Sequence, residues 1–177
     1  YPSYSVNMIT VALMEPKTQG NIGAIARVMA NFGFKNLILI NPKCKYLSEE
    51  SFKRAKHAKL ILKKAKVVKS FKYLEKFDLV VGTTAIIGTD YNIPRVPLSP
   101  EDFSKKIARV KGNIILVFGR ESSGLSNEEI QSCDFMVTIN TSMEYKTMNI
   151  SHSVAILLYE LFKQRAQPMN IPLGSSK

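Results

Sequence analysis

Short apolar runs alternate along the chain with longer segments in which apolar residues recur every three or four positions. Gly, Pro, Asn or Asp bound the short runs, as is typical of β-strands. The strands expected from this pattern are 7–14, 37–40, 67–69, 79–82, 114–118 and 135–139. Because these runs are apolar almost throughout, they predict a parallel sheet that is covered on both faces.

Helical periodicity fills the intervals between these strands. The expected helices are 22–32, 51–64, 71–76, 100–110 and 151–165. Regular alternation of strand and helix predicts an α/β fold with a mostly parallel sheet and flanking helices. At 177 residues the chain fits one domain, which we place at 1–165, and we interpret 166–177 as a tail or a linker to a further C-terminal module.

Positive charge is concentrated in one stretch. The chain carries a net charge of +11, and residues 43–76 hold twelve Lys or Arg against three Glu, which is +9 of that total. Apolar positions on the predicted helix 51–64 share one side, and the opposite side carries Lys53, Lys56, Lys63 and Lys64. Such a surface suits RNA, DNA or an anionic membrane, with an ordinary solvated face as the alternative.

The last predicted helix is apolar on more than one stripe. Its apolar residues are Val154, Ile156, Leu157, Leu158, Leu161 and Phe162. This width favours burial against the sheet and against a second subunit, and a well-buried helix of a monomer is the alternative.

The sequence lacks the motifs that mark several functional classes. Cys44 and Cys133 have no zinc-site spacing, and His57 and His152 form neither a metal motif nor a catalytic triad. No uncharged stretch, such as 79–89, is long enough to span a bilayer, and the first residues show no signal-peptide pattern. We therefore expect a reduced cytoplasmic protein that uses no metal and no membrane.

The first polar turn that could carry chemistry is 20–27, after the first strand. Asn21 is placed to cap the following helix, whose N-terminus favours an anion. Arg27 could hold a phosphate or stabilise negative charge that develops on an oxygen. Alternatively, Asn21 is only a cap, Gly23 only a close-packing position and Arg27 only a surface charge.

A second such turn, 118–125, follows an apolar strand at its carboxyl end, where open α/β sheets bind their ligands. Gly119 and Gly124 allow a tight turn, and Glu121 could accept a ribose hydroxyl, bind a basic side chain, or form a salt bridge with a neighbouring Arg. Ser126 followed by acidic residues indicates a helix start.

In the third turn, Thr147, Asn149 and Ser151 alternate with apolar residues just before the last helix. Ser151 is a plausible N-cap, whereas Asn149 has no evident local role. Thr83 and Thr84 end another strand and suit a pocket wall. None of these turns has the glycine spacing of a Rossmann fingerprint or a P-loop.

Taken in order, the three motifs closely resemble those of the SPOUT methyltransferases of the TrmH type. They read Asn21-x-Gly23-x-x-x-Arg27, Phe118-Gly119-x-Glu121-x-x-Gly124-Leu125 and Met148-Asn149-Ile150-Ser151. The resemblance implies a C-terminal deep trefoil knot, a homodimer and a pocket for S-adenosylmethionine. The cofactor-binding residues that it implies are Thr83, Thr84, Gly119, Glu121, Ile139, Thr147, Met148 and Asn149.

The same resemblance implies 2′-O-methylation of tRNA ribose at nucleotide 32 of the anticodon loop, with Arg27, Asn21, Glu121 and Asn149 as catalytic residues. RNA would bind Arg27 together with the four lysines of the basic helix. The family often has Ser at position 147 and an Arg where this chain reads Ile86-Ile87-Gly88. Alternatives are a different RNA target, such as ribosomal RNA, or a catalytically silent RNA-binding dimer.

Overall fold

A computed structural model describes residues 7–85 and 96–165. Its centre is one six-stranded sheet, in the order β3-β2-β1-β5-β4-β6, in which every pairing between neighbouring strands is parallel. The strands are β1 (Asn7–Met14), β2 (Asn36–Ile40), β3 (Lys66–Val68), β4 (Leu79–Thr84), β5 (Gly112–Phe118) and β6 (Phe135–Thr138). The predicted α/β class and all six predicted strands are confirmed, with small shifts at the strand ends.

Strand order reverses direction at β1. The chain builds β2 and β3 on one side of β1 and then crosses over to build β4, β5 and β6 on the other, so that β1 pairs with both β2 and β5. At such a switch point the connections leave the carboxyl ends of neighbouring strands in opposite directions, which opens a crevice. The sheet therefore presents a ligand-binding edge where β1, β5, β4 and β6 end.

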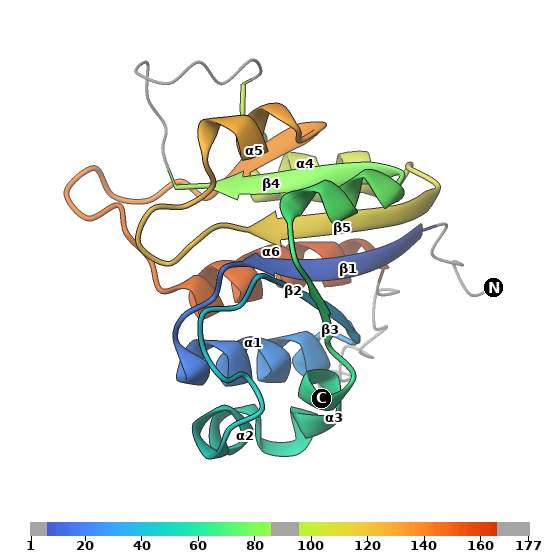
Figure 1. Ribbon diagram of the computed structural model, residues 1–177. Coiled ribbons are helices and arrows are strands. Elements are labelled where there is room, and N and C mark those ends of the chain that lie inside the picture. Colours follow the sequence, from blue (N-terminus) through green and yellow to red (C-terminus); the bar gives the residue numbers. More distant parts are fainter. Residues whose placement is uncertain (1–6, 86–95, 166–177) are drawn as a thin grey trace, which may run out of the picture.

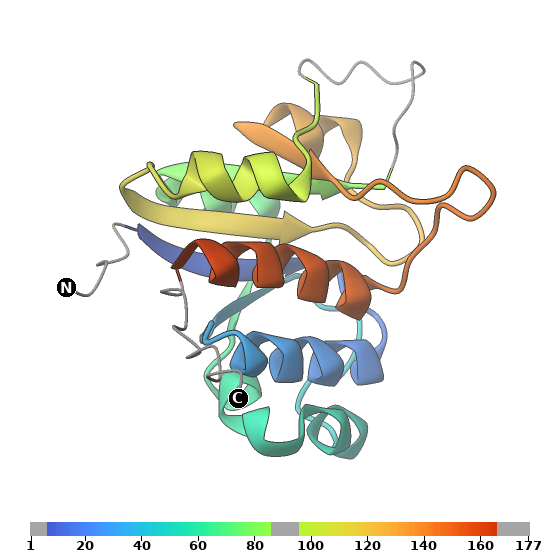
Figure 2. The ribbon, with the colours of Figure 1, turned by 180° about the vertical axis from the view of Figure 1, so that it is seen from behind.

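Helices cover both faces of the sheet (Figures 1 and 2). On one face lie α1 (Gln19–Asn31), α4 (Pro100–Ile107) and α6 (Ile150–Arg165), which runs between the other two. Outside α1 lie α2 (Glu49–Ala55), the 3₁₀ turn η1 (Lys56–Ala58) and α3 (Lys59–Lys63). The opposite face carries the 3₁₀ segment η2 (Phe71–Lys76) and α5 (Asn127–Gln131).

The two hydrophobic cores follow from alternation along the central strands. On β1, Ile9, Val11 and Leu13 point into the core under α1 and α6, whereas Ala12 and Met14 point into the core under η2 and α5. Successive side chains of a strand face opposite sides, so a strand buried on both sides must be apolar throughout. This explains why the central strands lack a polar alternation.

Two predicted helices differ in the structure. The expected helix 51–64 begins earlier, at Glu49, and is broken at Lys56, which has a φ of +54°. After the break Leu60 is 58% exposed, although its neighbours Ile61 and Leu62 are buried. The segment 71–76 forms a 3₁₀ helix in place of an α-helix. No Gly or Pro marks the break at Lys56, so the helical periodicity on either side of it predicted one continuous helix.

Some sequence interpretations concern residues outside the described ranges. These are the tail 166–177, the first residues of the chain and the Ile86-Ile87-Gly88 segment. The knotted threading of the C-terminal part stays a prediction.

Candidate active site

A pocket of about 370 Å³ lies where β4, β5 and β6 end. Residues 83–85, at the end of β4, form one wall, and 118–125, after β5, form another. The third wall combines Ile139 and 146–148, after β6, with side chains at the start of α6. We call this cavity the loop pocket. It joins three connections that are far apart in the sequence, because their parallel strands end at the same edge of the sheet.

The β5 connection turns tightly at two glycines. The amide of Arg120 donates to the carbonyl of Gly124, and the amide of Gly124 donates back to the carbonyl of Arg120. A Cβ at Gly119 would lie 2.5 Å from the carbonyl carbon of Gly124, and Gly124 has a φ of +69°. Glycine is therefore required at 119 for space and favoured at 124 for conformation.

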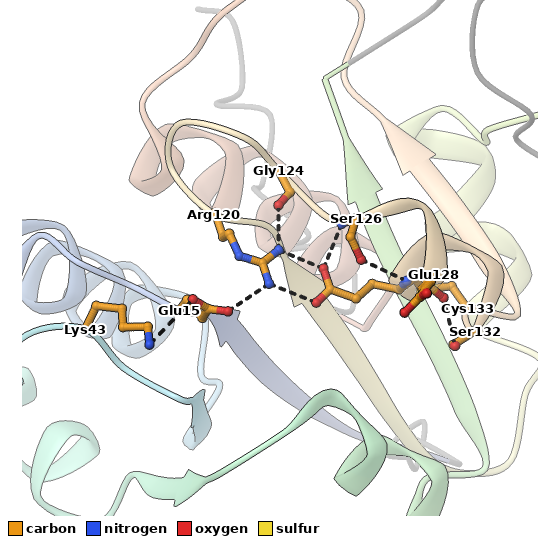
Figure 3. A network of polar contacts seen from close by, with 9 residues as sticks. Glu15, Lys43, Arg120, Gly124, Ser126, Glu128, Ser132 and Cys133 are labelled. Carbon is orange, nitrogen blue, oxygen red and sulfur yellow. Dashed lines mark hydrogen bonds and ion pairs between the residues drawn. The ribbon is translucent and has the colours of Figure 1, made fainter.

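Arg120 fastens this turn to two other elements (Figure 3). Its guanidinium donates to Glu129 on α5, at 2.8 and 3.0 Å, and to Glu15 after β1, at 2.9 Å. It also donates to the carbonyl of Gly124 at 3.1 Å. A planar guanidinium can bind both carboxylates at once, which a lysine ammonium cannot do with the same geometry. Arg120 thus fixes the β5 connection, one wall of the loop pocket, to α5 and to the segment after β1.

Electrostatic effects in this network reinforce each other. The hydrogen bonds that Arg120 donates to Glu129, opposed by burial and aided by those to Glu15, raise the pKa of Arg120. Burial alone would raise the pKa of Glu129, but hydrogen bonds from Arg120 and from the backbone of Ser126 outweigh it and lower that pKa. Ser126 and Glu129 also form a reciprocal capping box, which confirms the predicted helix start.

The three sequence motifs meet in one chain of hydrogen bonds. Glu121 accepts from the hydroxyl of Thr18 at 2.8 Å and from the side-chain amide of Asn21 at 3.1 Å. Asn149 donates to the Oδ1 of Asn21 at 3.2 Å. The Oδ1 of Asn149 then accepts from the amide and the hydroxyl of Ser151, at 2.9 and 2.7 Å. We call this chain the amide relay.

The relay corrects three sequence interpretations. Asn21 is not a helix cap, because α1 begins at Gln19 and Asn21 instead bridges Glu121 and Asn149. Ser151 is not the cap of α6, because it is Asn149 that accepts from the helix backbone. Glu121 accepts from Thr18 and Asn21, and the ion pairs of this turn belong to its neighbour Arg120.

A second, polar pocket of about 600 Å³ lies on the other side of the relay. Asn21 and Asn149 line it, together with side chains from the start of α1, from α2 and from the start of α6. The full lining is Lys17, Thr18, Gln19, Gly20, Asn21, Ala24, Cys44, Glu50, Arg54, Asn149, Ser151 and His152. We call it the polar pocket. The amide relay is therefore the wall that separates the loop pocket from the polar pocket.

Most of the cofactor-binding residues expected from the resemblance lie together. The loop pocket is lined by Thr83, Thr84, Gly119, Glu121, Ile139, Thr147 and Met148. Asn149, the eighth, lines the polar pocket. Ile139 with other aliphatic side chains makes the floor apolar, and the loop backbones supply polar groups around it. An apolar cavity with a few placed polar groups is typical of a cofactor site.

Arg27 and the expected RNA-binding lysines lie outside both pockets. Arg27 is exposed on α1, seven residues after Gly20 and three after Ala24, so it continues the stripe of α1 that borders the polar pocket. It stands about 9 Å further along the helix axis than Asn21. Exposed positions on α2, on η1, at the end of α3 and just after it carry Lys53, Lys56, Lys63 and Lys64.

Sequence reasoning missed several residues around the pockets. Thr18 and Arg120 bind their carboxylate partners through contacts between residues that are far apart in the chain, which one sequence does not reveal. Cys44 lines the polar pocket, and burial, together with the charge of Glu121, raises the pKa of its thiol. For Cys133, burial and nearby carboxylates raise the pKa to about 12. Both cysteines are free.

Within 7–85 and 96–165, no three His, Cys, Asp or Glu side chains group closely enough to hold a metal ion. Over the same ranges, no helix has the length and apolar character needed to cross a membrane.

The sequence is similar to a known protein family and to individual proteins of other organisms. The sequence model of the SpoU rRNA Methylase family matches residues 8–159. A tRNA (cytidine-2′-O-)-methyltransferase TrmJ of Methanocaldococcus jannaschii is 45% identical over 161 residues, covering 90% of this chain and 70% of the relative. An uncharacterized tRNA/rRNA methyltransferase of Haemophilus influenzae is 34% identical, covering 86% of this chain and 62% of that protein.

A solved structure of a similar protein has the same fold as this chain. The solved structure of a methylase family protein from Haemophilus influenzae superposes with a TM-score of 0.83 at 33% identity. The superposition covers 90% of this chain and 67% of that one. The chain thus spans about two thirds of the length of these three proteins.

Proposed function

The chain belongs to the SpoU methylase family, and from this premise we propose that it methylates a ribose 2′-oxygen of tRNA with S-adenosylmethionine as the methyl donor. The proposed target is nucleotide 32 of the anticodon loop. The observation that carries the proposal is the amide relay, which joins all three motifs between two pockets of different character. One pocket suits the cofactor and the other suits a polar substrate.

The loop pocket fits S-adenosylmethionine. Its volume of about 370 Å³ lies in the range of small-ligand sites, and its aliphatic floor suits an adenine ring. Thr147, Met148, Gly119 and Glu121 all line this cavity, and we propose that they contact the cofactor. When bound, the cofactor supplies a methyl group on a positively charged sulfur, which an oxygen nucleophile attacks in line.

The chain's own residues would orient the ribose. Asn21 and Asn149 present their side chains to the polar pocket, where they are held by Glu121 and Ser151 and cannot rotate freely. Fixed hydrogen-bonding groups at a reaction centre lower the barrier because they need no reorganisation. The relay would thus hold the 2′-hydroxyl toward the loop pocket.

Arg27 would stabilise negative charge as the 2′-oxygen loses its proton to water. An arginine is a poor proton acceptor, since a guanidinium is protonated at every ordinary pH. A charged guanidinium on the exposed stripe that leads into the polar pocket can bind the forming alkoxide or the adjacent phosphate. We propose this electrostatic role in place of a base role.

RNA binding would extend over the basic surface of α2, η1 and α3, where Lys53, Lys56, Lys63 and Lys64 are exposed. Each phosphate contact releases counterions and makes the affinity depend on salt. Such an enzyme would act in the cytoplasm, where its tRNA substrate is found.

We also propose a homodimer. The side of α6 turned away from the sheet exposes Tyr159 (48%) and Phe162 (40%), and the centroids of both rings lie 5.8 Å from that of Phe32, the C-cap of α1. A contiguous aromatic patch on a soluble chain is typical of a protein interface. The second apolar stripe predicted for α6 is therefore exposed, and a second copy of the chain could pack on it.

A ribosomal RNA substrate is the second candidate. It is favoured by the description of the matching family and by the tRNA/rRNA wording for the relative from Haemophilus influenzae.

The proposal is tested by incubating the protein with S-adenosylmethionine labelled on its methyl group and with unmodified tRNA or ribosomal RNA transcripts. Nuclease digestion of the RNA then locates the label. Label on the 2′-oxygen of tRNA nucleotide 32 is the expected outcome. Label only on ribosomal RNA supports the second candidate, and cofactor binding without transfer to either RNA contradicts both.

A further inference from the structure

Helix α2 is held against the first turn of α1 by an unusually close contact. A Cβ at Gly23 would lie 2.1 Å from the carbonyl oxygen of Ser51, so only glycine permits this approach. The hydroxyl of Ser51 also donates to the carbonyl of Gln19 at 3.0 Å. The contact fixes α2 at the rim of the polar pocket.

This placement brings an arginine to the pocket. Arg54 and Glu50, one turn apart on α2, both line it, and a Cβ at Gly20 would lie 3.8 Å from the Nε of Arg54. The side chain of Arg54 is 63% exposed. Among the described residues its one ion pair is with Glu50, at 3.6 Å between Nε and Oε1. That contact leaves both terminal guanidinium nitrogens available.

Lys17 also lines the polar pocket, and its hydrogen bond points to a different part of the chain. Lys17 donates to the hydroxyl of Ser122, on the β5 connection, at 3.4 Å. Arg54 stands on the α2 rim, outside the amide relay. A ribose held by the relay would therefore have Lys17 toward the cofactor side and Arg54 toward the outer surface, where an RNA strand must continue.

We propose that Arg54 binds a backbone phosphate of the RNA strand beside the target nucleotide, and that Glu50 weakens this contact by competing for the guanidinium. The proposal rests on the proposed RNA methylation. A guanidinium offers two parallel donors to a phosphate, a geometry that its single long contact with Glu50 does not use. Arg54 is then a positioning residue, which acts on substrate binding and not on the transferring methyl group.

Steady-state kinetics with a tRNA transcript test this role. Arg54→Ala should raise the KM for tRNA about tenfold and leave kcat within about twofold, since one good charged contact has this size. Arg54→Lys should restore part of the loss, because it keeps the charge but not the paired donors. Arg109→Ala is the matched control, since Arg109 is exposed just before β5, at the opposite edge of the sheet.

The competition by Glu50 has its own test. Glu50→Gln should lower the KM for tRNA about threefold, because it removes the competing charge and keeps the shape of the side chain. In the double variant Glu50→Gln, Arg54→Ala this gain should disappear. Equal gains in the presence and absence of Arg54 would contradict the proposed coupling.

Binding measurements separate this inference from the proposed function. Fluorescence anisotropy with a labelled anticodon stem-loop should show a weaker affinity for Arg54→Ala than for Arg109→Ala, and a salt dependence that is smaller by about one counterion. Equal affinities of these two variants would overturn the role of Arg54 even if methylation occurs. Absence of methyl transfer by the unchanged protein, with the Arg54 effect on binding intact, would overturn the proposed function alone. Melting temperatures check that every variant is folded.

Discussion

Asn149 donates its side-chain amide to Asn21 across 3.2 Å, joining the start of α6 to the start of α1 over 128 positions of sequence. The direction of this bond is set at one end. Glu121 is a carboxylate and can only accept, so Asn21 must turn its NH₂ toward Glu121 and its oxygen toward Asn149. Asn149 is then left with its oxygen facing Ser151. The negative charge of Glu121 therefore orients the side-chain amides of both Asn21 and Asn149.

Glu121→Gln should therefore lower the methylation rate, because a neutral amide can donate or accept and no longer fixes the direction of the relay. We expect kcat to fall about 10- to 100-fold, the size of a lost hydrogen bond to a charged group. Single-turnover rates with tRNA measure this effect. Glu128→Gln on α5 is the control, since Glu128 lines neither pocket. A rate equal to that of the control would exclude an orienting role for Glu121.

Arg27→Ala should reduce kcat by about 10²- to 10³-fold, as expected when a group that stabilises developing charge is removed. Arg27 lines neither pocket, so the affinity for S-adenosylmethionine should be unchanged in calorimetry. Arg27→Lys should retain more activity at neutral pH than Arg27→Ala because it keeps a positive charge. An Arg27→Ala variant with normal kcat would show that the guanidinium is only a surface charge.

Gly23→Ala should destabilise the protein, and Gly20→Ala should not. A methyl group at 23 meets the backbone oxygen of Ser51 at 2.1 Å, whereas at 20 its nearest neighbour is the flexible end of Glu50, at 3.2 Å. We expect Gly23→Ala to cost about 1–3 kcal/mol of unfolding free energy. Gly20→Ala should change it by less than about 1 kcal/mol, since alanine favours the helix. Urea unfolding of both variants compares the two values.

Acid should weaken the Arg120 network. The pKa of Glu129 is lowered in the folded state, so its contribution to stability is present above the ordinary glutamate pKa of about 4.3 and is lost as the pH falls through the folded value. The stability of the unchanged protein should thus exceed that of Glu129→Gln at pH 7 and approach it at low pH. Thermal unfolding between pH 7 and pH 3 measures this difference. A difference that is independent of pH would contradict the charge-based account.

A charge on the exposed aromatic patch should dissociate the proposed homodimer. Phe162→Glu and Tyr159→Glu place a carboxylate on a face that is about half exposed in the single chain, so the fold should survive. Light scattering after gel filtration should give twice the chain mass for the unchanged protein and the chain mass for the variants. Lys35→Glu, at an exposed position before β2, is the control. A monomeric unchanged protein would contradict the proposal.

The sequence predicted most of the architecture because local patterns determine it. Continuous apolar runs placed all six strands, and the central strands β1 and β5 are buried on both faces. The break at Lys56 left no trace, because helical periodicity continues on both sides of it. The resemblance brought the motif residues together, but the partners of Asn21, Asn149 and Arg120 depend on tertiary geometry. Ser151 next to Asn149 illustrates the limit, since either residue could cap a helix and only the backbone path selects Asn149.

The pairing of β1 with β5 also constrains when the protein can fold. Asn7 is in register with Gly112, so one side of the first strand stays without its partner until more than a hundred residues have been added. During synthesis β1 can pair with β2 early, but its other edge remains open to pairing with other chains. Closing so long a loop is slow. Assembly of the central pair should therefore limit the rate of folding, and newly made chains should be most prone to aggregate before β5 leaves the ribosome.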